Sequence, residues 1–89
     1  MKYNNNYVLK ELAGDTILVY QNENEVNFSK IITLNDVSVV ILKSLQEGLS
    51  QDKIVERILS EYEIDKETVA NDVEEFIKKL LELGVVIND

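Results

Sequence analysis

Residues 28–45, with the sequence FSKIITLNDVSVVILKSL, decide the fold, because the apolar pattern changes its period at Asn35. The part before this residue, 28–34, is rich in β-branched and aromatic residues, which favour extended strands. In the part after it, 37–45, apolar residues recur at the three- and four-residue spacing of one helix face. Asn35 can cap this helix with its side chain, and Gly48 can end it. The stretch predicts a strand that leads directly into a helix.

Two further strands precede this stretch. Residues 7–13 and 16–20 are again rich in β-branched and aromatic side chains, and Gly14-Asp15 between them is a two-residue hairpin signal. The next segment, 21–27, is polar and rich in asparagine, as a reversing loop is. We therefore expect two antiparallel strands, a loop, and a third strand over 28–34.

Two further helices follow. Ser50 can cap the second helix, and Asp65 can cap a third and longest helix that ends at Gly84. Arg57 and Glu61 lie at the spacing of a weak ion pair on the second helix. Three strands followed by three helices predict an α+β domain rather than alternating β–α–β units. The short connection between helices two and three indicates a helix-turn-helix, and the three-stranded antiparallel sheet beside it makes the whole a winged helix.

The ends of the chain carry weaker patterns. A chain of 89 residues is expected to form one domain over 7–89, after a polar tail over 1–6 that we expect to be disordered. Residues 85–87 are too short to assign, and either pack across the core or pair with a strand. The N terminus has no apolar signal segment, and no apolar run approaches the ~18 residues of a membrane span. These patterns predict a cytoplasmic protein that does not engage a membrane.

The composition removes most kinds of catalytic site. The chain has no cysteine and no histidine, so disulfides, zinc-type metal sites, thiolate nucleophiles and the usual general base are excluded. The candidate carboxylate pair, Asp72 and Glu75, matches an ordinary solvated helix face. Neither Ser44 nor Ser50 stands in the Asp-Ser-Leu motif that carrier proteins modify. We therefore expect a protein without catalytic activity, cofactor or metal.

The charge disfavours nucleic acid as the partner. The chain has 9 Lys and Arg against 17 Asp and Glu, a formal net charge of −8 that would repel a polyanion. The third helix carries mainly acidic residues, whereas a helix that reads DNA presents Arg, Lys, Asn or Gln. A winged-helix domain that binds DNA or another protein through the third helix stays as the alternative to a peptide binder.

The third strand offers a binding edge. A strand with one partner leaves alternate backbone amide and carbonyl groups free, and an extended peptide can pair with them as an added strand. The candidate strand residues are Phe28, Ser29, Lys30, Ile31, Ile32 and Thr33. A groove between this strand and the third helix would supply apolar anchors, and its helix residues are expected to be Val69, Asp72, Val73, Phe76, Lys79 and Leu80. Periodicity does not separate groove residues from core residues, so both interpretations stay open.

Taken together, the sequence resembles the PqqD-like family of precursor-peptide recognition elements over about residues 7–87. The resemblance depends on the order and spacing of six segments: Ala13-Gly14-Asp15-Thr16-Ile17-Leu18-Val19, Leu34-Asn35, Leu45-Gln46-Glu47-Gly48, residues 54–62, residues 72–80, and Gly84-Val85-Val86. Each segment is weak alone, and their arrangement together is specific.

The resemblance implies a function. Such domains bind the leader segment of a ribosomally made precursor peptide at the edge of the third strand, against the third helix. They present the precursor to a modifying enzyme, which can be a radical S-adenosylmethionine enzyme, a leader peptidase and cyclase pair, or a cyclodehydratase. Because no second domain is evident in the chain, the resemblance implies a free-standing member of the family.

Overall fold

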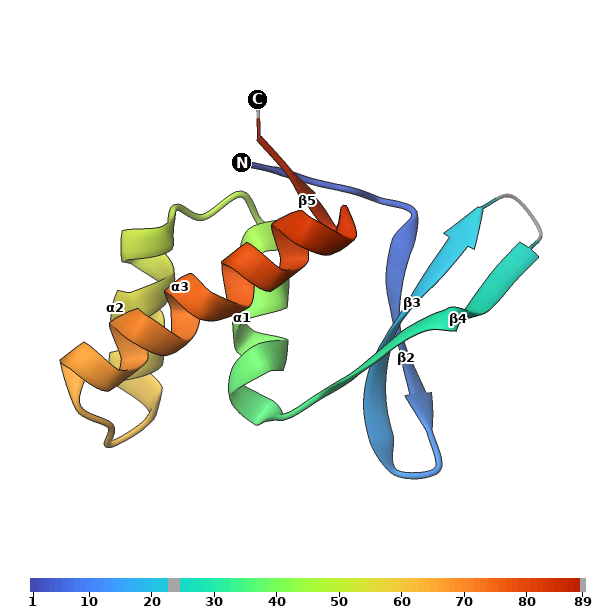
Figure 1. The fold of residues 1–89 in the computed structure, drawn as a ribbon. Coiled ribbons are helices and arrows are strands. Elements are labelled where there is room, and N and C mark those ends of the chain that lie inside the picture. Colours follow the sequence, from blue (N-terminus) through green and yellow to red (C-terminus); the bar gives the residue numbers. More distant parts are fainter. Residues whose placement is uncertain (23–24, 89) are drawn as a thin grey trace.

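The computed structural model describes residues 1–22 and 25–88, and residues 25–30 through their backbone only. Its elements, in chain order, are β1 (Lys2–Tyr3), β2 (Tyr7–Leu12), β3 (Asp15–Asn22), β4 (Glu25–Leu34), α1 (Asp36–Gln46), α2 (Gln51–Glu61), α3 (Lys66–Leu83) and β5 (Val86–Ile87). The three helices form one side of the molecule and the strands β2, β3 and β4 form the other (Figure 1). The predicted α+β order of a three-stranded sheet followed by three helices is confirmed.

The sheet is antiparallel throughout, in the order β2-β3-β4. Its first turn lies one residue earlier than predicted, because Leu12 pairs with Asp15 and the turn residues are therefore Ala13 and Gly14. Both have positive φ, 52° for Ala13 and 87° for Gly14, as the tight turns of β-hairpins require. Glycine adopts this conformation readily, whereas alanine does so at a cost.

The predicted loop over 21–27 is largely strand. Gln21 pairs with Val26 and Asn22 pairs with Glu25, and the tip of the predicted loop, residues 23 and 24, lies outside the described residues. A β-ladder is made by backbone groups, so a polar sequence does not prevent it.

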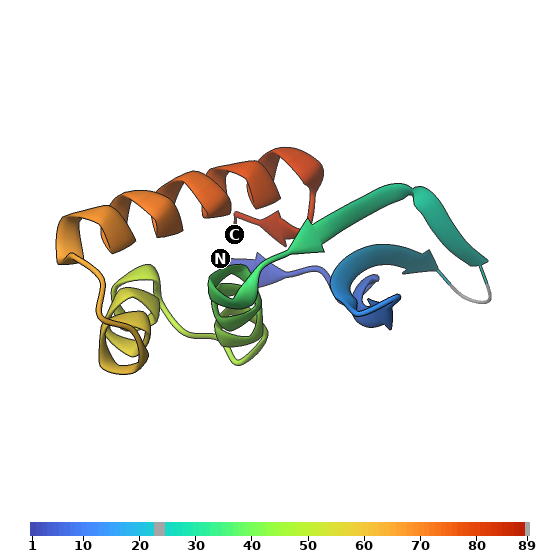
Figure 2. The same ribbon diagram turned by 90° about the horizontal axis from the view of Figure 1, so that it is seen from below.

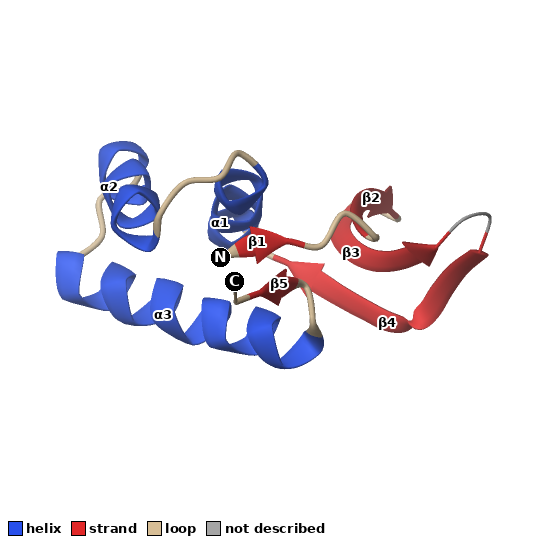
Figure 3. Ribbon diagram, turned by 90° about the horizontal axis from the view of Figure 1, so that it is seen from above, coloured by secondary structure: helices blue, strands red, loops and turns tan. Residues whose placement is uncertain are grey.

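The strand β4 bends in its middle. Leu18 of β3 pairs with Ile32 of β4, but Tyr20 pairs with Asn27, so Val19 alone stands opposite residues 28–31. Such a bulge leaves residues outside the ladder and turns the strand. The half of β4 that leads into α1 lies toward the helices, and the other half points away from them (Figures 2 and 3).

All three predicted helix caps are confirmed. The Asn35 side chain accepts a hydrogen bond from the Ser38 amide at 2.8 Å, and Ser50 and Asp65 accept from the amides three residues later. Gly84 ends α3 in the left-handed conformation, with φ of 79°. The caps fix where each helix begins and ends.

One buried cluster joins the sheet to the helices. It contains Leu18 and Leu34 from the sheet, and its helix members include Leu42, Ile58, Val73 and Leu80, each 0% exposed. In the described part of the chain, no helix combines the length and apolar character that a membrane span requires.

The N-terminal residues differ from the expected disordered tail. Lys2–Tyr3 forms β1, which pairs antiparallel with β5 (Val86–Ile87), so the unassigned residues 85–87 are also placed. Val86, which pairs with Tyr3, and the preceding Val85 are both buried. A local reading of the polar N terminus does not detect this strand, because its hydrogen-bonding partners lie at the opposite end of the chain.

Candidate peptide-binding site

The outer edge of β4 is the first part of the candidate site. Among the strands that the structure describes, β4 pairs only with β3, so its other edge has no strand partner. Ile31 is 38% exposed and Thr33 is exposed, whereas Ile32 is half-buried and Leu34 is buried. Predicted residues 28–30 also belong to β4 by their backbone. The regular ladder next to the helices covers 32–34, so the accessible edge beside the helices is short.

A pocket continues the site beyond the end of β4. Its volume is about 430 Å³, and it lies between the first turns of α1 and one face of α3. The lining consists of Ile64 together with Asn35, Val37, Ser38 and Ile41 on the α1 side, and Val69, Asp72, Glu75, Phe76 and Lys79 on α3. Because β4 leads directly into α1, the pocket opens where the free strand edge ends.

The predicted α3 residues separate into two groups. Val69, Asp72, Phe76 and Lys79 line the pocket, which faces α1 rather than the third strand as the groove interpretation expected, and Val69 is itself only 2% exposed. Val73 and Leu80 are each 0% exposed and belong to the core instead, so their side chains are not accessible from the pocket. Both groups fit the helical period, and only the packing of the assembled fold separates them.

Other pocket residues were not predicted. Glu75 could have been found by spacing, since residues three and four apart share a helix face and Glu75 stands between Asp72 and Lys79. Val37 and Ile41 fit the predicted apolar face of the first helix. No local pattern in the sequence indicates that they line a pocket. The contribution of Ile64 depends on how the connection between α2 and α3 turns.

The pocket has an apolar floor and a charged rim. Val37, Ile41, Val69 and Phe76 provide apolar surface, and the charges come from Asp72, Glu75 and Lys79. Ion pairs recorded between described residues join Lys53 to Glu56, Arg57 to Glu47 and Lys78 to Glu74, and they leave the three rim charges out. The rim charges can therefore interact with a bound molecule. This combination suits an apolar side chain in a polypeptide better than a polyanion.

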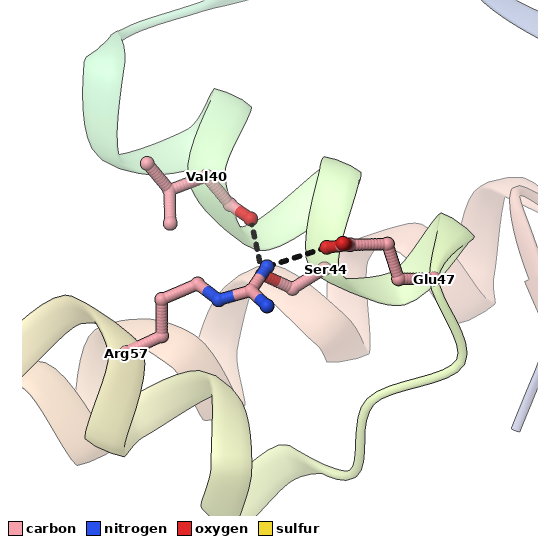
Figure 4. Close-up of polar contacts among 4 residues, drawn as sticks. All are labelled: Val40, Ser44, Glu47 and Arg57. Atoms are coloured by element: carbon pink, nitrogen blue, oxygen red, sulfur yellow. Dashed lines mark hydrogen bonds and ion pairs between the residues drawn. The ribbon is translucent and has the colours of Figure 1, made fainter.

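A second pocket lies between α1 and α2, and polar residues in it link the two helices. The Arg57 guanidinium donates hydrogen bonds to the Ser44 hydroxyl and the Glu47 carboxylate, and Ser44 donates to the Val40 carbonyl (Figure 4). The predicted Arg57–Glu61 pair is replaced by this link, because Glu47 lies across the helix interface. The link ties α2 to α1 and satisfies a hydroxyl in a fully buried residue. Within the described residues, no group of three potential ligands could hold a metal ion.

Known proteins share the sequence family and the fold of this chain. The family model described as coenzyme PQQ synthesis protein D (PqqD) matches residues 7–86. The solved structure "TbiB1 in Complex with the TbiA(beta) Leader Peptide" superposes with a TM-score of 0.77 at 24% sequence identity, and the match covers 100% of both chains. At this identity the superposition shows a shared fold. No curated protein matches the sequence. The family model covers most of the chain, and the chain therefore belongs to the PqqD family.

Proposed function

We propose that this domain binds the leader segment of a ribosomally synthesised precursor peptide by strand addition and presents it to a modifying enzyme without itself catalysing a reaction. Three observations support the proposal: membership of the PqqD family, the shared fold with a protein solved in complex with a leader peptide, and an unpaired strand edge that ends at an apolar pocket. The strand edge and the pocket together are the strongest support, because they are observed in this chain itself and not inferred from its relatives.

The energetics require both parts of the site. Ordering a peptide strand costs roughly 1–2 kcal/mol per residue in backbone entropy, and each hydrogen bond returns only about 1 kcal/mol net. A short ladder along 32–34 therefore does not hold a leader by itself. An apolar leader side chain that fills the pocket against Phe76 contributes about 1.5–3 kcal/mol if fully buried. The proposed site is thus the β4 edge plus the pocket, with Val73 and Leu80 as its support.

The direction of the leader follows from the sheet. Every pairing within β2-β3-β4 is antiparallel, and purely antiparallel sheets are favoured over mixed ones. An antiparallel leader strand begins beside Leu34, where β4 ends. The residues that precede the paired segment therefore reach past Asn35 into the pocket, and those that follow it run along β4 away from the helices.

The partner enzyme is proposed from the family alone. Radical S-adenosylmethionine enzymes, leader peptidase and cyclase pairs, and cyclodehydratases all act on precursors held by such domains. The chain supplies the binding function, and the chemistry belongs to the partner. The DNA-binding alternative gains no support, because α3 turns Asp72 and Glu75 toward the pocket and carries further acids outside it.

The proposal is tested by selection followed by mapping. A library of random 20-residue peptides displayed on mRNA is selected on the immobilised domain, and the most enriched peptide is titrated into ¹⁵N-labelled protein. We expect amide shifts to concentrate on residues 31–35 and on the pocket face of α3. The β2 edge at Val8 and Lys10, the other free edge of the same sheet, is the internal control. Absence of enrichment, or shifts centred on β2, would contradict the proposal.

A further inference from the structure

The carbonyl groups at the end of α3 are bound by the N terminus of the chain. The Tyr7 hydroxyl donates to the Leu83 carbonyl at 3.0 Å, and the Asn4 side-chain amide donates to the Gly84 carbonyl at 3.0 Å. The Asn4 backbone amide donates to the Val85 carbonyl at 2.8 Å. Three consecutive carbonyls are thus satisfied from residues 4 and 7, and that of Leu83 is one that the end of a helix leaves without an intrahelical partner.

The same segment is also bound to the sheet. The Gln21 amide donates to the Asn6 carbonyl at 2.6 Å, and Tyr7 pairs with Tyr20 in the β2–β3 ladder. The rings of Tyr7 and Tyr20 meet edge to face, with centroids 5.2 Å apart. Tyr3, in β1, donates its hydroxyl to the Tyr7 carbonyl at 2.6 Å. We call residues 2–7 the N-terminal strap; it crosses from β5 to the start of β2 (Figure 1).

The position of the N-terminal strap bears on the width of the site. The proposed leader lies between β4 and α3, and the strap is bonded to the end of α3 and to the sheet that contains β4. Asn4 and Tyr7 bind carbonyls at and just after the end of α3, and Asn6 and Tyr7 are also bound to β3, the neighbour of β4. An added strand needs a fixed spacing of about 4.8 Å from its neighbour, and its side chains must still reach the helix. A wall that moves would have to be ordered when the leader binds.

We propose that Asn4 and Tyr7 are positioning residues, which hold α3 at the separation from β4 that a bound leader strand requires. The inference rests on the proposed leader binding. It goes beyond the family match, which begins at Tyr7 and leaves residues 2–6 outside. Asn4 and Tyr7 act through the end of α3 and are not among the described residues that line the pocket.

The separation between β4 and α3 can be measured without any ligand. The natural chain has no cysteine, so Thr33→Cys and Lys79→Cys place two spin labels on the opposing walls, both at exposed positions. Their distance distribution is recorded by pulsed electron paramagnetic resonance, at a temperature where circular dichroism shows every variant folded. We expect Asn4→Ala and Tyr7→Phe to broaden the distribution and move it to longer distances. Asn5→Ala and Tyr62→Phe, the same changes at sites without these bonds, are expected to leave it unchanged.

The second measurement is the affinity of the same variants, without labels, for the most enriched library peptide. Loss of one positioning hydrogen bond is expected to weaken binding by about five- to tenfold in Asn4→Ala and Tyr7→Phe. The proposal is overturned by an unchanged label distance, which would leave the strap a purely stabilising role, or by a changed distance with unchanged affinity. Failure of the proposed function looks different: no peptide then binds the unaltered domain, and the positioning role falls with it.

Discussion

At the scale of single residues, Val73 and Phe76 show how one helix face is divided between core and site. They lie three residues apart on α3 and both fit its apolar period. Val73 is 0% exposed in the buried cluster, whereas Phe76 is half-buried and lines the pocket. A residue that remains partly exposed in the free domain has surface left to bury against a ligand, and a fully buried residue has none.

Phe76→Ala is therefore expected to lower the affinity for the most enriched library peptide by about tenfold or more, because apolar contact in the pocket is lost. Val73→Ala is the control, because it creates a cavity and lowers the free energy of unfolding by roughly 2 kcal/mol. The affinity of the folded Val73→Ala variant should match the unaltered domain. Titration calorimetry and urea unfolding measure the two quantities. Equal affinity losses in both variants would mean that Phe76 does not contact the peptide.

The rim charges give a prediction about sequence preference. Asp72 and Glu75 outnumber Lys79 at the pocket, so we expect the selected peptides to carry Lys or Arg beside the residue that fills it. In the double variant Asp72→Asn, Glu75→Gln, a repeated selection should lose this preference. The control is Glu74→Gln, Glu82→Gln, which removes the same charge from parts of α3 outside the pocket. A preference that is unchanged in the first variant would show that Asp72 and Glu75 do not cause it, and a preference lost in both variants would assign it to net charge.

The turn between β2 and β3 offers a prediction about stability. Ala13 has φ of 52°, a left-handed conformation that costs a non-glycine residue about 1–2 kcal/mol and that asparagine tolerates better. Ala13→Asn creates the Asn-Gly pair preferred in such turns, and is expected to raise the free energy of unfolding by about 0.5–1 kcal/mol. Ala70→Asn, inside α3, should lower it. Chemical unfolding that shows no gain for Ala13→Asn would contradict this turn geometry.

At the scale of elements, the bend in β4 limits how much of the strand a leader can use. Only the half that ends at Leu34 lies toward α1 and α3, and the half that starts at Glu25 points away (Figure 3). The added leader strand is therefore expected to be short. Beyond one of its ends, the leader is expected to make side-chain contacts in the pocket. The ladder uses backbone groups, whereas the pocket uses side chains.

The division of the site into a backbone ladder and a side-chain pocket predicts which changes to the peptide weaken binding. Single N-methylations along the enriched peptide should weaken binding at alternate residues of the paired segment, because successive amides of a strand point in opposite directions. For the peptide residues that lie in the pocket, the effect of N-methylation should not alternate. Alanine substitution of these residues should weaken binding instead. Affinities of the two peptide series, measured by fluorescence anisotropy, give the comparison. An absence of alternation throughout would exclude strand addition as the binding mode.

At the scale of the whole molecule, the local parts of the fold could be predicted from sequence and the distant contacts could not. The caps at Asn35, Ser50 and Asp65 are signals within a few residues, and the strand-to-helix order follows from period changes. The N-terminal strap depends on bonds between residues 4 and 84, and no short-range pattern marks it. The site divides in the same way: spacing places Asp72, Phe76 and Lys79 on one face, but only the assembled fold puts α1 opposite them.

The most direct test of leader binding is the contact map of the bound peptide. Isotope-filtered nuclear Overhauser spectra are recorded on ¹³C-labelled domain with the unlabelled enriched peptide, so that only intermolecular contacts appear. We predict backbone contacts from the peptide to residues 31–34 of β4 in antiparallel order, together with contacts from one apolar peptide side chain to the Phe76 ring. Contacts to the β2 edge, or to the Arg57–Glu47 face of α1 and α2, without contacts to β4 and Phe76, would contradict the proposed function.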